Sequence, residues 1–329
     1  MEGIAAFNKE ERAELFLATA DQKRLAAPAV EKDFWVCWVL KQIFADPELA
    51  NLVLFKGGTT LSKCFGLIER FSEDIDLILD WRVLTDEDPY ANRSNTQQDR
   101  FNKQMEVKVQ SYIGDQLMAM VTKAVATHCV ATLHEEKSHS IMLHYPKAFT
   151  SDYIKPVVEL EFGAMSAMEP SGEFVISPYC AEVAPHLFDM TEINVKAIEA
   201  KKTFWDKVTI LHVEAHRSKD RPQPARYSRH YYDLYRMINS GVLEEAMADI
   251  ALLKDVVAFK VKFYPQGWAN YQGATEGKFS LLPETSIKST LENDYAQMQE
   301  MIFGEYPLFD EILARIGVFE QQLNKAFNA

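Results

Sequence analysis

The stretch FKGGTTLSKCFGLIERFSEDIDLIL, residues 55–79, contains the pattern that decides the fold of this chain. Gly57 and Gly58 end a short apolar run, which predicts a buried strand followed by a tight turn. A short helix can begin near Thr59. Acidic and apolar residues then alternate over 73–80, which is typical of a strand in a sheet. The stretch therefore predicts a strand, a glycine turn, a short helix and a second strand.

Asp74 and Asp76 carry the chemistry of this stretch. Residues i and i+2 of a strand point to the same face, so the two carboxylates project together. Such a pair suits Mg²⁺, which also keeps waters and substrate phosphates as ligands. At the glycine turn, bare backbone N–H groups and the start of a helix can bind an anion, to which the hydroxyls of Thr59 and Thr60 can donate. A phosphate-binding turn opposite a metal site is the minimum apparatus for nucleotidyl transfer.

The whole chain divides into an α/β half and a helical half. The pattern predicts a buried helix over 30–45, a further helix over 103–123 and an exposed loop over 81–104. Strands are predicted at 51–55, 73–80, 139–145 and 154–162. Helices are predicted at 191–216, 227–239, 242–262 and 285–326, with a long connection over 264–284. We therefore predict two domains, residues 1–188 and 189–329.

The composition is that of a folded protein, because 47% of the 329 residues are hydrophobic and 25% are charged. No apolar run approaches the roughly 20 residues that a bilayer span needs, so no membrane partner is expected. The four cysteines are far apart in sequence and form no CxxC pair. They fit free thiols in a reducing compartment, and we expect a cytoplasmic protein.

The formal net charge of −13 disfavours indiscriminate binding to nucleic acids. The segment 212–230 is an exception, because its basic residues outnumber its acidic ones. The basic residues are Arg217, Lys219, Arg221, Arg226 and Arg229, against Glu214 and Asp220. With Tyr227, Tyr231 and Tyr232 nearby, this segment could bind RNA phosphates and stack on bases. The alternative is an ordinary charged loop.

Three stretches together resemble the AbiEii/AbiGii-type toxin nucleotidyltransferases of type IV toxin–antitoxin and abortive-infection systems. They are GGTTLSK followed by RFSEDIDL (57–77), TFWDKVTILH (203–212) and RHYYDLYRM (229–237), and VEKDFWV (30–36) is also similar. The resemblance extends from about residue 30 to 240 and leaves 241–329 unmatched. It implies a polymerase-β-like minimal nucleotidyltransferase fold, an α/β domain with a mixed sheet followed by a helical domain.

The resemblance also assigns roles to residues near the glycine turn. The residues expected to bind the nucleotide are Lys56, Gly57, Gly58, Thr59, Thr60, Ser72, Lys207 and Arg229. Ser72 would lie in the turn before the metal strand, and Asp74 and Asp76 would be metal ligands. Lys207 would contact the triphosphate, although a lysine in an apolar helix can simply extend its ammonium group to water.

Asp233 matches the second aspartate of a family motif and is expected to be catalytic. His230 stands where many members have the first aspartate. The alternative for Asp233 is a helix-surface ion pair with Arg229, four residues earlier. For a third metal-binding carboxylate, the strand VVELEFG (157–163) offers Glu159 and Glu161 on one face. The resemblance favours Glu161, and a solvated strand face remains the alternative.

The resemblance implies Mg²⁺, as two ions, and an NTP whose α-phosphate is attacked by an acceptor hydroxyl while pyrophosphate leaves. It further implies an RNA acceptor such as tRNA and a DNA-binding antitoxin as partner. Two other functions stay open from the residues alone. One is nucleotidyl transfer to a small molecule such as an antibiotic or metabolite, and the other is NTP binding without catalysis.

Overall fold

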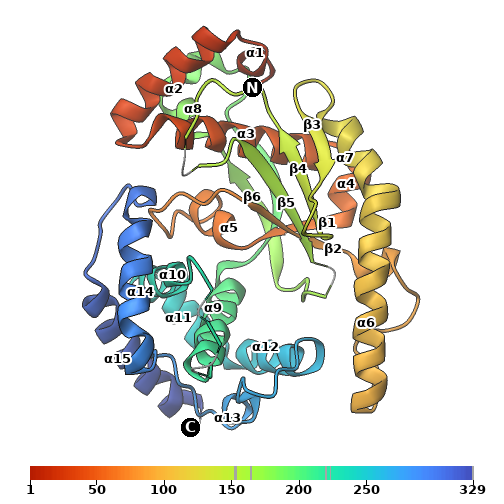
Figure 1. The fold of residues 1–329 in the computed structure, drawn as a ribbon, viewed down its shortest axis with the longest axis vertical. Coiled ribbons are helices and arrows are strands. Elements are labelled where there is room, and N and C mark those ends of the chain that lie inside the picture. The colour runs from red at the N-terminus through yellow and green to blue at the C-terminus, as the bar shows by residue number, and fades with distance from the viewer. Residues whose placement is uncertain (152–153, 164, 219–220, 223, 328–329) are drawn as a thin grey trace. The chain divides into compact units, whose positions relative to one another are not determined.

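The computed structural model describes residues 1–329 apart from 152–153, 164, 219–220, 223 and 328–329 (Figure 1). The chain folds into two compact units. Unit 1 comprises Met1–Cys64 and Phe71–Ile198, and unit 2 comprises Phe65–Arg70 and Glu199–Ala329. The predicted domain boundary after residue 188 thus precedes the division between the units, which falls after Ile198.

A mixed sheet lies at the centre of unit 1. Its described strands number seven, in the order β3-β4-β5-β2-β1-β7-β6. They are β1 (Val53–Lys56), β2 (Ile75–Leu79), β3 (Val130–Leu133), β4 (Ser140–His144), β5 (Val157–Gly163), β6 (Ser171–Ile176) and β7 (Ile193–Ile198). The β1–β7 and β2–β5 pairs are parallel, and the other pairs are antiparallel. The predicted α/β class with a mixed sheet is therefore confirmed, with β1, β2, β4 and β5 at the predicted places.

One face of this sheet packs against helix α3 (Ala27–Ala45), which crosses the strands in Figure 1. The helix is apolar on nearly all sides, as expected for a buried helix. Trp35 and Trp38 are fully buried and pack edge to face, with ring centroids 5.7 Å apart. Phe55 of β1 and Leu77 of β2 belong to the same apolar core. The predicted buried helix is confirmed, and it begins slightly earlier than the pattern indicated.

Helix α6 (Asn95–Tyr112) begins inside the segment predicted as an exposed loop, 81–104. Ser94 and Gln97 start it, because each side chain accepts a hydrogen bond from the backbone N–H of the other. The helix is mostly polar and buries a narrow stripe that includes Phe101, so its apolar pattern is weak. The remaining described helical segments of unit 1 are α1 (Glu2–Ala5), α2 (Lys9–Lys23), α4 (Pro47–Leu52), α5 (Gly58–Lys63), α7 (Met118–Val125), α8 (Tyr179–Val183), the π-helical Ile113–Leu117 and the 3₁₀ turns Trp81–Val83 and Pro185–Leu187.

Strand β7 corrects the helix predicted over 191–216. Its sequence INVKAI alternates, with Ile193, Val195 and Ala197 buried and the residues between them exposed. Pairing with β1 and β6 extends these residues into a strand, and α9 (Ala200–Ala215) begins only after Glu199. The prediction failed because these residues form a strand only by pairing with other strands: β1 lies far away in the sequence, and β6 is separated from β7 by residues 177–192.

Unit 2 is built from helices. Those described are α9, α10 (Ser228–Ile238), α11 (Val242–Met247), α12 (Ile250–Phe263), α13 (Tyr271–Thr275), α14 (Thr285–Gln297), α15 (Phe309–Phe327) and the 3₁₀ turn Met298–Met301. The helix predicted over 242–262 is two helices, because the side chain of Asp249 accepts from the N–H of Leu252 and starts α12 anew. The helix predicted over 285–326 is likewise two helices, α14 and α15, separated by a segment that contains Pro307.

Residues 65–70 belong to unit 2 although they lie between α5 and β2 in the sequence. The carbonyl oxygen of Glu69 accepts a hydrogen bond of 2.9 Å from the N–H of Phe303, and Arg70 forms an antiparallel bridge with Ile302. The chain therefore leaves unit 1 after α5 and returns just before the acidic strand. In the part of the chain that the structure describes, none of the helices combines the length and apolar character that a membrane crossing requires.

Candidate active site

Lys56, Asp76 and Glu161 lie side by side on three neighbouring strands. Asp76 of β2 is the register partner of Lys56 on β1 and of Glu161 on β5. Register partners share a face of the sheet and lie about 5 Å apart. This face is opposite to the one that packs against α3, since Phe55 and Leu77 point into that core. The sheet thus presents one lysine and two carboxylates in a row on its second face.

Gly57 lies directly against Asp76. A Cβ atom built on Gly57 would lie 2.0 Å from Oδ2 of Asp76, and the glycine has a φ of +86°. Its φ and ψ of 86° and −160° belong to a region that is essentially restricted to glycine. Only glycine fits this position, for two independent reasons. The predicted phosphate-binding turn and the second aspartate of the DxD triplet are therefore in contact.

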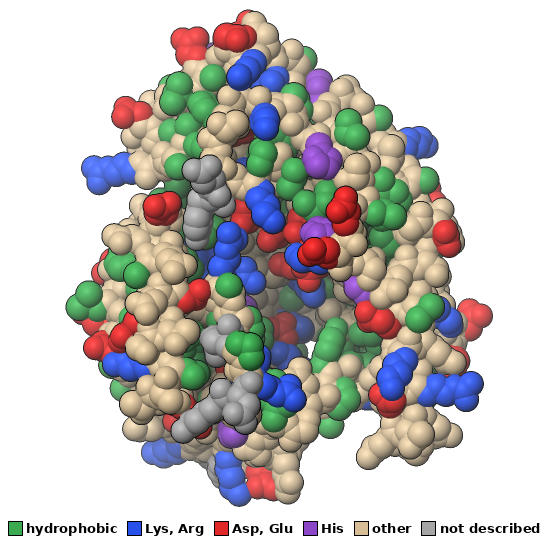
Figure 2. Space-filling view, viewed as in Figure 1, with side chains coloured by type: hydrophobic (Ala, Val, Ile, Leu, Met, Phe, Trp, Pro, Cys, Tyr) green, Lys and Arg blue, Asp and Glu red, His purple; other side chains and the backbone are tan. Residues whose placement is uncertain are grey.

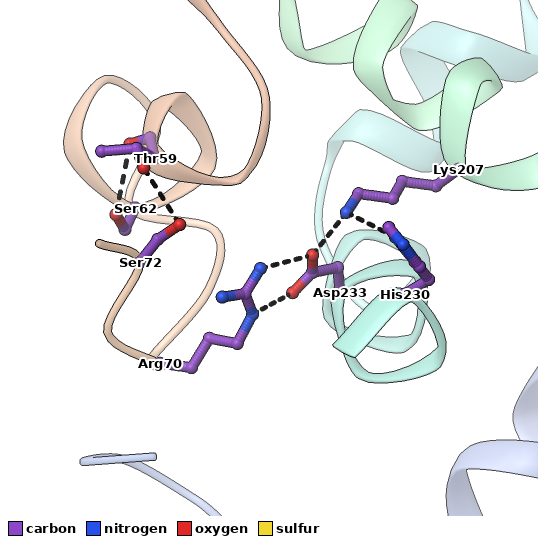
Figure 3. A network of polar contacts seen from close by, with 7 residues as sticks. All are labelled: Thr59, Ser62, Arg70, Ser72, Lys207, His230 and Asp233. Carbon is purple, nitrogen blue, oxygen red and sulfur yellow. Dashed lines mark hydrogen bonds and ion pairs between the residues drawn. The ribbon is translucent and has the colours of Figure 1, made fainter. Parts of the chain in front are cut away.

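The two threonines after the turn hold it in place. Thr59 Oγ1 donates to the carbonyl oxygen of Asp74 at 2.6 Å and lies 2.9 Å from the hydroxyl of Ser72 (Figure 3). Thr60 Oγ1 donates to the carbonyl oxygen of Gly57 at 2.7 Å. Both threonines are buried. The sequence predicted that these hydroxyls donate to phosphate, but in the structure they form hydrogen bonds within the protein. The backbone N–H groups of the turn are then the groups that could bind an anion.

Acidic groups crowd this face of the sheet. Burial and the neighbouring Glu73, with smaller effects of Glu159 and Asp76, raise the pKa of Asp74 to about 6. Burial and the charge of Asp76 also raise the pKa of Glu161. Figure 2 shows acidic, basic and histidine side chains gathered over the part of unit 1 where β4 and β5 lie in Figure 1. Carboxylates that raise each other's pKa favour a bound cation, because the cation relieves their repulsion.

Glu159 and Glu161 differ in their surroundings. Glu159 Oε1 accepts hydrogen bonds from Lys137 Nζ at 2.7 Å and Ser140 Oγ at 2.8 Å. Burial opposes ionisation of Glu159, but these two hydrogen bonds outweigh it and lower its pKa. Glu161 is exposed and is the register partner of Asp76. The surroundings therefore favour Glu161 over Glu159 as a third carboxylate of the site.

The donor set suits a hard divalent cation, because Asp74, Asp76 and Glu161 offer only carboxylate oxygens. Among the described residues, however, no group of three or more His, Cys, Asp or Glu side chains is arranged to hold a metal ion. The three carboxylates are neighbours that do not converge on one point. Asp76 is partly buried and Glu161 is exposed.

Unit 2 contains a second polar network, around Asp233 (Figure 3). Asp233 is fully buried, and Arg70 binds both of its oxygens, with Nε at 2.7 Å from Oδ1 and Nη2 at 2.9 Å from Oδ2. Lys207 Nζ donates to Oδ2 at 2.6 Å and lies 3.1 Å from Nδ1 of His230. Burial alone would raise the pKa of Asp233, but Arg70 and Lys207 lower it below its ordinary value.

This network changes what the sequence suggested for Asp233. The alternative ion pair with Arg229 is wrong, because Asp233 is paired with Arg70 and Lys207 while Arg229 is exposed. Asp233 has no exposed surface, and both of its oxygens are bonded within unit 2. Burial lowers the pKa of Lys207, and Asp233 opposes that shift. Arg70 was missed, although it is the only arginine in the stretch 55–79 and lies just ahead of the acidic strand.

The basic segment 212–230 also differs from its prediction. Tyr231 and Tyr232 are fully buried and cannot stack on bases. Arg217 is paired with Glu214, with Nε 2.5 Å from Oε2. Lys219 and Asp220 lie outside the described residues. Arg226 and Arg229 are exposed.

A family model described as nucleotidyl transferase AbiEii toxin, type IV TA system, matches residues 38–315. The chain belongs to this AbiEii family. It is therefore a nucleotidyltransferase of a toxin–antitoxin family whose enzymes use an NTP and a divalent metal. The match includes the glycine turn, the DxD triplet, Lys207 and Asp233, and it extends through much of the region that the sequence motifs left unmatched.

Several solved structures are similar to this AbiEii-family protein at low identity. JHP933 from Helicobacter pylori is 15% identical, with a TM-score of 0.43, over 92% of this chain and 94% of that chain. MenT4, a nucleotidyltransferase toxin from Mycobacterium tuberculosis H37Rv, is 14% identical, with a TM-score of 0.46, over 98% of both chains. A putative nucleotidyltransferase from Helicobacter pylori is 15% identical, with a TM-score of 0.44, over 92% of this chain and 97% of that chain. None of the curated proteins compared with the chain matches it.

Proposed function

We propose that this AbiEii-family protein transfers a nucleotide from an NTP to an RNA acceptor such as tRNA, with Mg²⁺ as its metal. The contact between Gly57 and Asp76 carries the proposal, because it brings a phosphate-binding turn and a metal-binding carboxylate within one site. The register of Asp76 with Glu161 adds a second carboxylate on the same face. A triphosphate chelated to a divalent ion requires these two kinds of group side by side.

The carboxylates would hold two Mg²⁺ ions. Asp74 and Asp76 would bind the first, and Glu161 would take part in binding the second. When bound, the metal neutralises charge on the triphosphate and lowers the pKa of the acceptor hydroxyl. The raised pKa values of Asp74 and Glu161 support this assignment, because both carboxylates are destabilised as anions until a cation is present.

The remaining residues bind and orient the nucleotide. The N–H groups of Gly57 and Gly58 would donate to phosphate oxygens, and Lys56, beside Asp76, would offset phosphate charge. The acceptor oxygen then bonds to the α-phosphorus in line with the bond to pyrophosphate, which breaks. The family resemblance implies that Lys207 contacts the pyrophosphate part of the triphosphate. Asp233, held by Arg70, would fix the position of the Lys207 ammonium group.

RNA is proposed as the acceptor because Arg226 and Arg229 are exposed in the basic segment of an otherwise acidic chain. A type IV toxin–antitoxin family implies an antitoxin partner, and we propose that it binds DNA. The four cysteines are free. A cytoplasmic location is proposed, since free thiols, NTPs and RNA are all compatible with a reducing compartment.

The test is incubation of the full chain with Mg²⁺, each α-labelled NTP in turn and total RNA, followed by electrophoresis and a pyrophosphate assay. We expect one or more NTPs to label RNA and release pyrophosphate in equal amounts. Asp76→Ala should remove both signals, since metal catalysis contributes several kcal/mol. Full activity in a folded Asp76→Ala variant would contradict the proposed site.

Two other outcomes separate the alternatives. Pyrophosphate release that survives ribonuclease treatment and requires a low-molecular-weight extract would identify a small-molecule acceptor. Binding of an NTP without pyrophosphate release, with every RNA fraction tried, would identify a binding module. Both results would contradict RNA transfer, and they differ in whether Asp76→Ala has any catalytic effect.

A further inference from the structure

Three consecutive charged residues of α3, Glu31, Lys32 and Asp33, are buried in a mostly apolar helix. Burying a charge is unfavourable unless the charge is paired and hydrogen-bonded. Replacing a buried ion pair by apolar residues is often neutral or stabilising, so such pairs are weak devices for stability alone. Stability alone therefore does not explain the buried charges of Lys32 and Asp33, and the positions of their partners matter.

Lys32 and Asp33 each form one sealed ion pair. Lys32 Nζ lies 2.7 Å from Oε2 of Glu73, and the two side chains are 2% and 10% exposed. Asp33 Oδ1 lies 2.7 Å from Nζ of Lys63, and these side chains are 3% and 5% exposed. Asp33 Oδ2 also accepts a hydrogen bond of 2.7 Å from the backbone N–H of Tyr179. Water screens neither pair, so each fixes the geometry of its partner.

The partners of these pairs occupy special places in the chain. Lys63 is the last residue of α5, immediately before the chain leaves unit 1 after Cys64. Glu73 comes soon after the chain returns at Phe71, and it directly precedes Asp74. Adjacent residues of one helix turn thus tie down both ends of the excursion that residues 65–70 make into unit 2.

The same two ends belong to the candidate active site. Helix α5 begins with the Gly57–Gly58 turn, and Glu73 leads into Asp74, which directly precedes β2, and then into Asp76 on β2. The hydrogen bond from Thr59 to the carbonyl oxygen of Asp74 joins the two ends directly. The pairing of β1 with β2 also links the glycine turn to the strand, since Lys56 is the register partner of Asp76. Lys63 and Glu73 lie outside this pairing, and the ties to α3 fix these two positions.

We propose that Lys32 and Asp33 are positioning residues that hold the glycine turn and Asp74 in the geometry needed for metal and phosphate. The proposal rests on the assignment of the metal to Asp74 and Asp76 in the proposed function. It gives a role to the VEKDFWV stretch, which the sequence motifs left without one. In this proposal, contacts within unit 1 fix the site geometry close to Cys64, where the chain leaves the unit, and to Phe71, where it returns.

The test uses two double variants of the full chain, Lys32→Met/Glu73→Met and Asp33→Asn/Lys63→Met. Each removes one positive and one negative charge, so the net charge of the protein is unchanged. Folding is checked by circular dichroism, and Mn²⁺ binding is measured by electron paramagnetic resonance without NTP. We expect both variants to fold and to bind Mn²⁺ about tenfold more weakly, the effect of losing groups that orient metal ligands. The Mg²⁺ concentration for half-maximal transfer should rise by the same factor, with a smaller change in kcat at saturating Mg²⁺.

The matched control is Asp99→Asn/Lys103→Met, which removes an exposed ion pair of α6 in the same unit. It should leave Mn²⁺ binding within twofold of the wild type. Unchanged Mn²⁺ binding in a folded Lys32 or Asp33 double variant would overturn the inference while leaving the proposed function intact. If both double variants fail to fold, the pairs serve stability and the inference is also wrong. Wild-type protein that neither binds Mn²⁺ nor transfers a nucleotide would instead overturn the proposed function.

Discussion

Two aspartates from the family motifs, Asp76 in unit 1 and Asp233 in unit 2, lie in opposite surroundings. Asp76 is partly exposed, rests against a glycine and has Glu161 as its register partner. Asp233 is fully buried, and two cations bind its oxygens. A carboxylate among carboxylates attracts a further cation, whereas one already neutralised by Arg70 and Lys207 does not. Membership in a motif therefore does not decide whether a residue does chemistry or holds another residue in place.

The pKa shifts differ in the same way. Burial and neighbouring acids raise the pKa of Asp74 to about 6, whereas Arg70 and Lys207 overcome burial and lower the pKa of Asp233. Ionised Asp233 thus stabilises unit 2 above its unfolded-state pKa near 4, and that contribution is lost as the pH falls. Ionised Asp74 is unfavourable in the metal-free protein, and its negative charge becomes useful when a cation binds.

The largest expected effect is on stability, from Asp233→Asn. Removing one partner of a buried ion pair leaves the other charges unpaired and lowers the free energy of unfolding by about 3–5 kcal/mol. Urea unfolding monitored by circular dichroism should show an earlier transition for unit 2. The matched control is Asp310→Asn, whose carboxylate is 72% exposed and pairs with Lys288. It should change the free energy of unfolding by no more than about 0.5 kcal/mol. If Asp233→Asn and Asp310→Asn changed the free energy of unfolding equally, the structural role that sets Asp233 apart from Asp76 would be wrong.

Gly57→Ala tests the contact at the other aspartate. The new methyl carbon would lie 2.0 Å from Asp76 Oδ2, far inside van der Waals contact, and the backbone conformation is strained for alanine. Displacing a metal ligand by about 1 Å lowers kcat/KM for nucleotidyl transfer by roughly 10²-fold. The control is Gly3→Ala, because a Cβ atom there meets nothing within 4 Å. Wild-type activity in Gly57→Ala would show that the glycine is a simple turn residue.

The pattern around residues 55–79 predicted much of unit 1, because its signals are local. Glycines that end an apolar run, and acidic residues that alternate with apolar ones, act within a few residues and gave β1, α5 and β2. Strand β7 was missed because pairing with β1 and β6 makes it a strand, and neither pairing is marked in the sequence of β7 itself: β1 is distant, and residues 177–192 separate β7 from β6. The edge strand β3 was missed because most of its residues are exposed, which leaves no regular apolar pattern.

The candidate site shows the same limit. Asp74 and Asp76 could be proposed from their spacing alone, since the period of a strand puts them on one face. The partner of Asp233 could not, because Arg70 is 163 residues away and the helical spacing pointed to Arg229 instead. Burial of Tyr231 and Tyr232 was equally hidden, because tyrosines beside arginines occur both in binding surfaces and in cores. These contacts form only when distant parts of the chain fold together, so no local sequence pattern predicts them.

Glu161→Gln and Glu159→Gln should separate two carboxylates that share a strand face. Glu161 is exposed beside Asp76, so its loss should lower kcat at fixed Mg²⁺ by about 30-fold, or roughly 2 kcal/mol. Glu159 is engaged by Lys137 and Ser140, so its loss should lower kcat by less than about threefold. Each variant is the control of the other. A larger effect of Glu159→Gln would assign the third carboxylate to Glu159.

Metal affinity should depend on pH through Asp74. Its carboxyl, with a pKa of about 6, must lose a proton before it can bind a cation. Because the ionised fraction falls about tenfold between pH 7 and pH 5, Mn²⁺ affinity should fall about tenfold over that interval. Electron paramagnetic resonance at pH 5, 6 and 7 measures it. Asp74→Asn should bind Mn²⁺ weakly, with little dependence on pH between 5 and 7. A wild-type Mn²⁺ affinity that stays constant between pH 5 and pH 7 would contradict the assignment of Asp74 as a metal ligand.

The smallest effect is expected from Arg229→Ala, which tests the exposed side of the helix that carries Asp233. Arg229 is exposed while Asp233 on the same helix is sealed, so the substitution should leave stability unchanged. If Arg229 contacts an RNA phosphate, the KM for RNA should rise about threefold, and the slope of log KM against log salt should decrease by about 0.7. The KM for the NTP should not change, because an acceptor contact acts on RNA alone. A change in the KM for the NTP, with no change in the KM for RNA, would show instead that Arg229 binds the nucleotide, as the family resemblance implies.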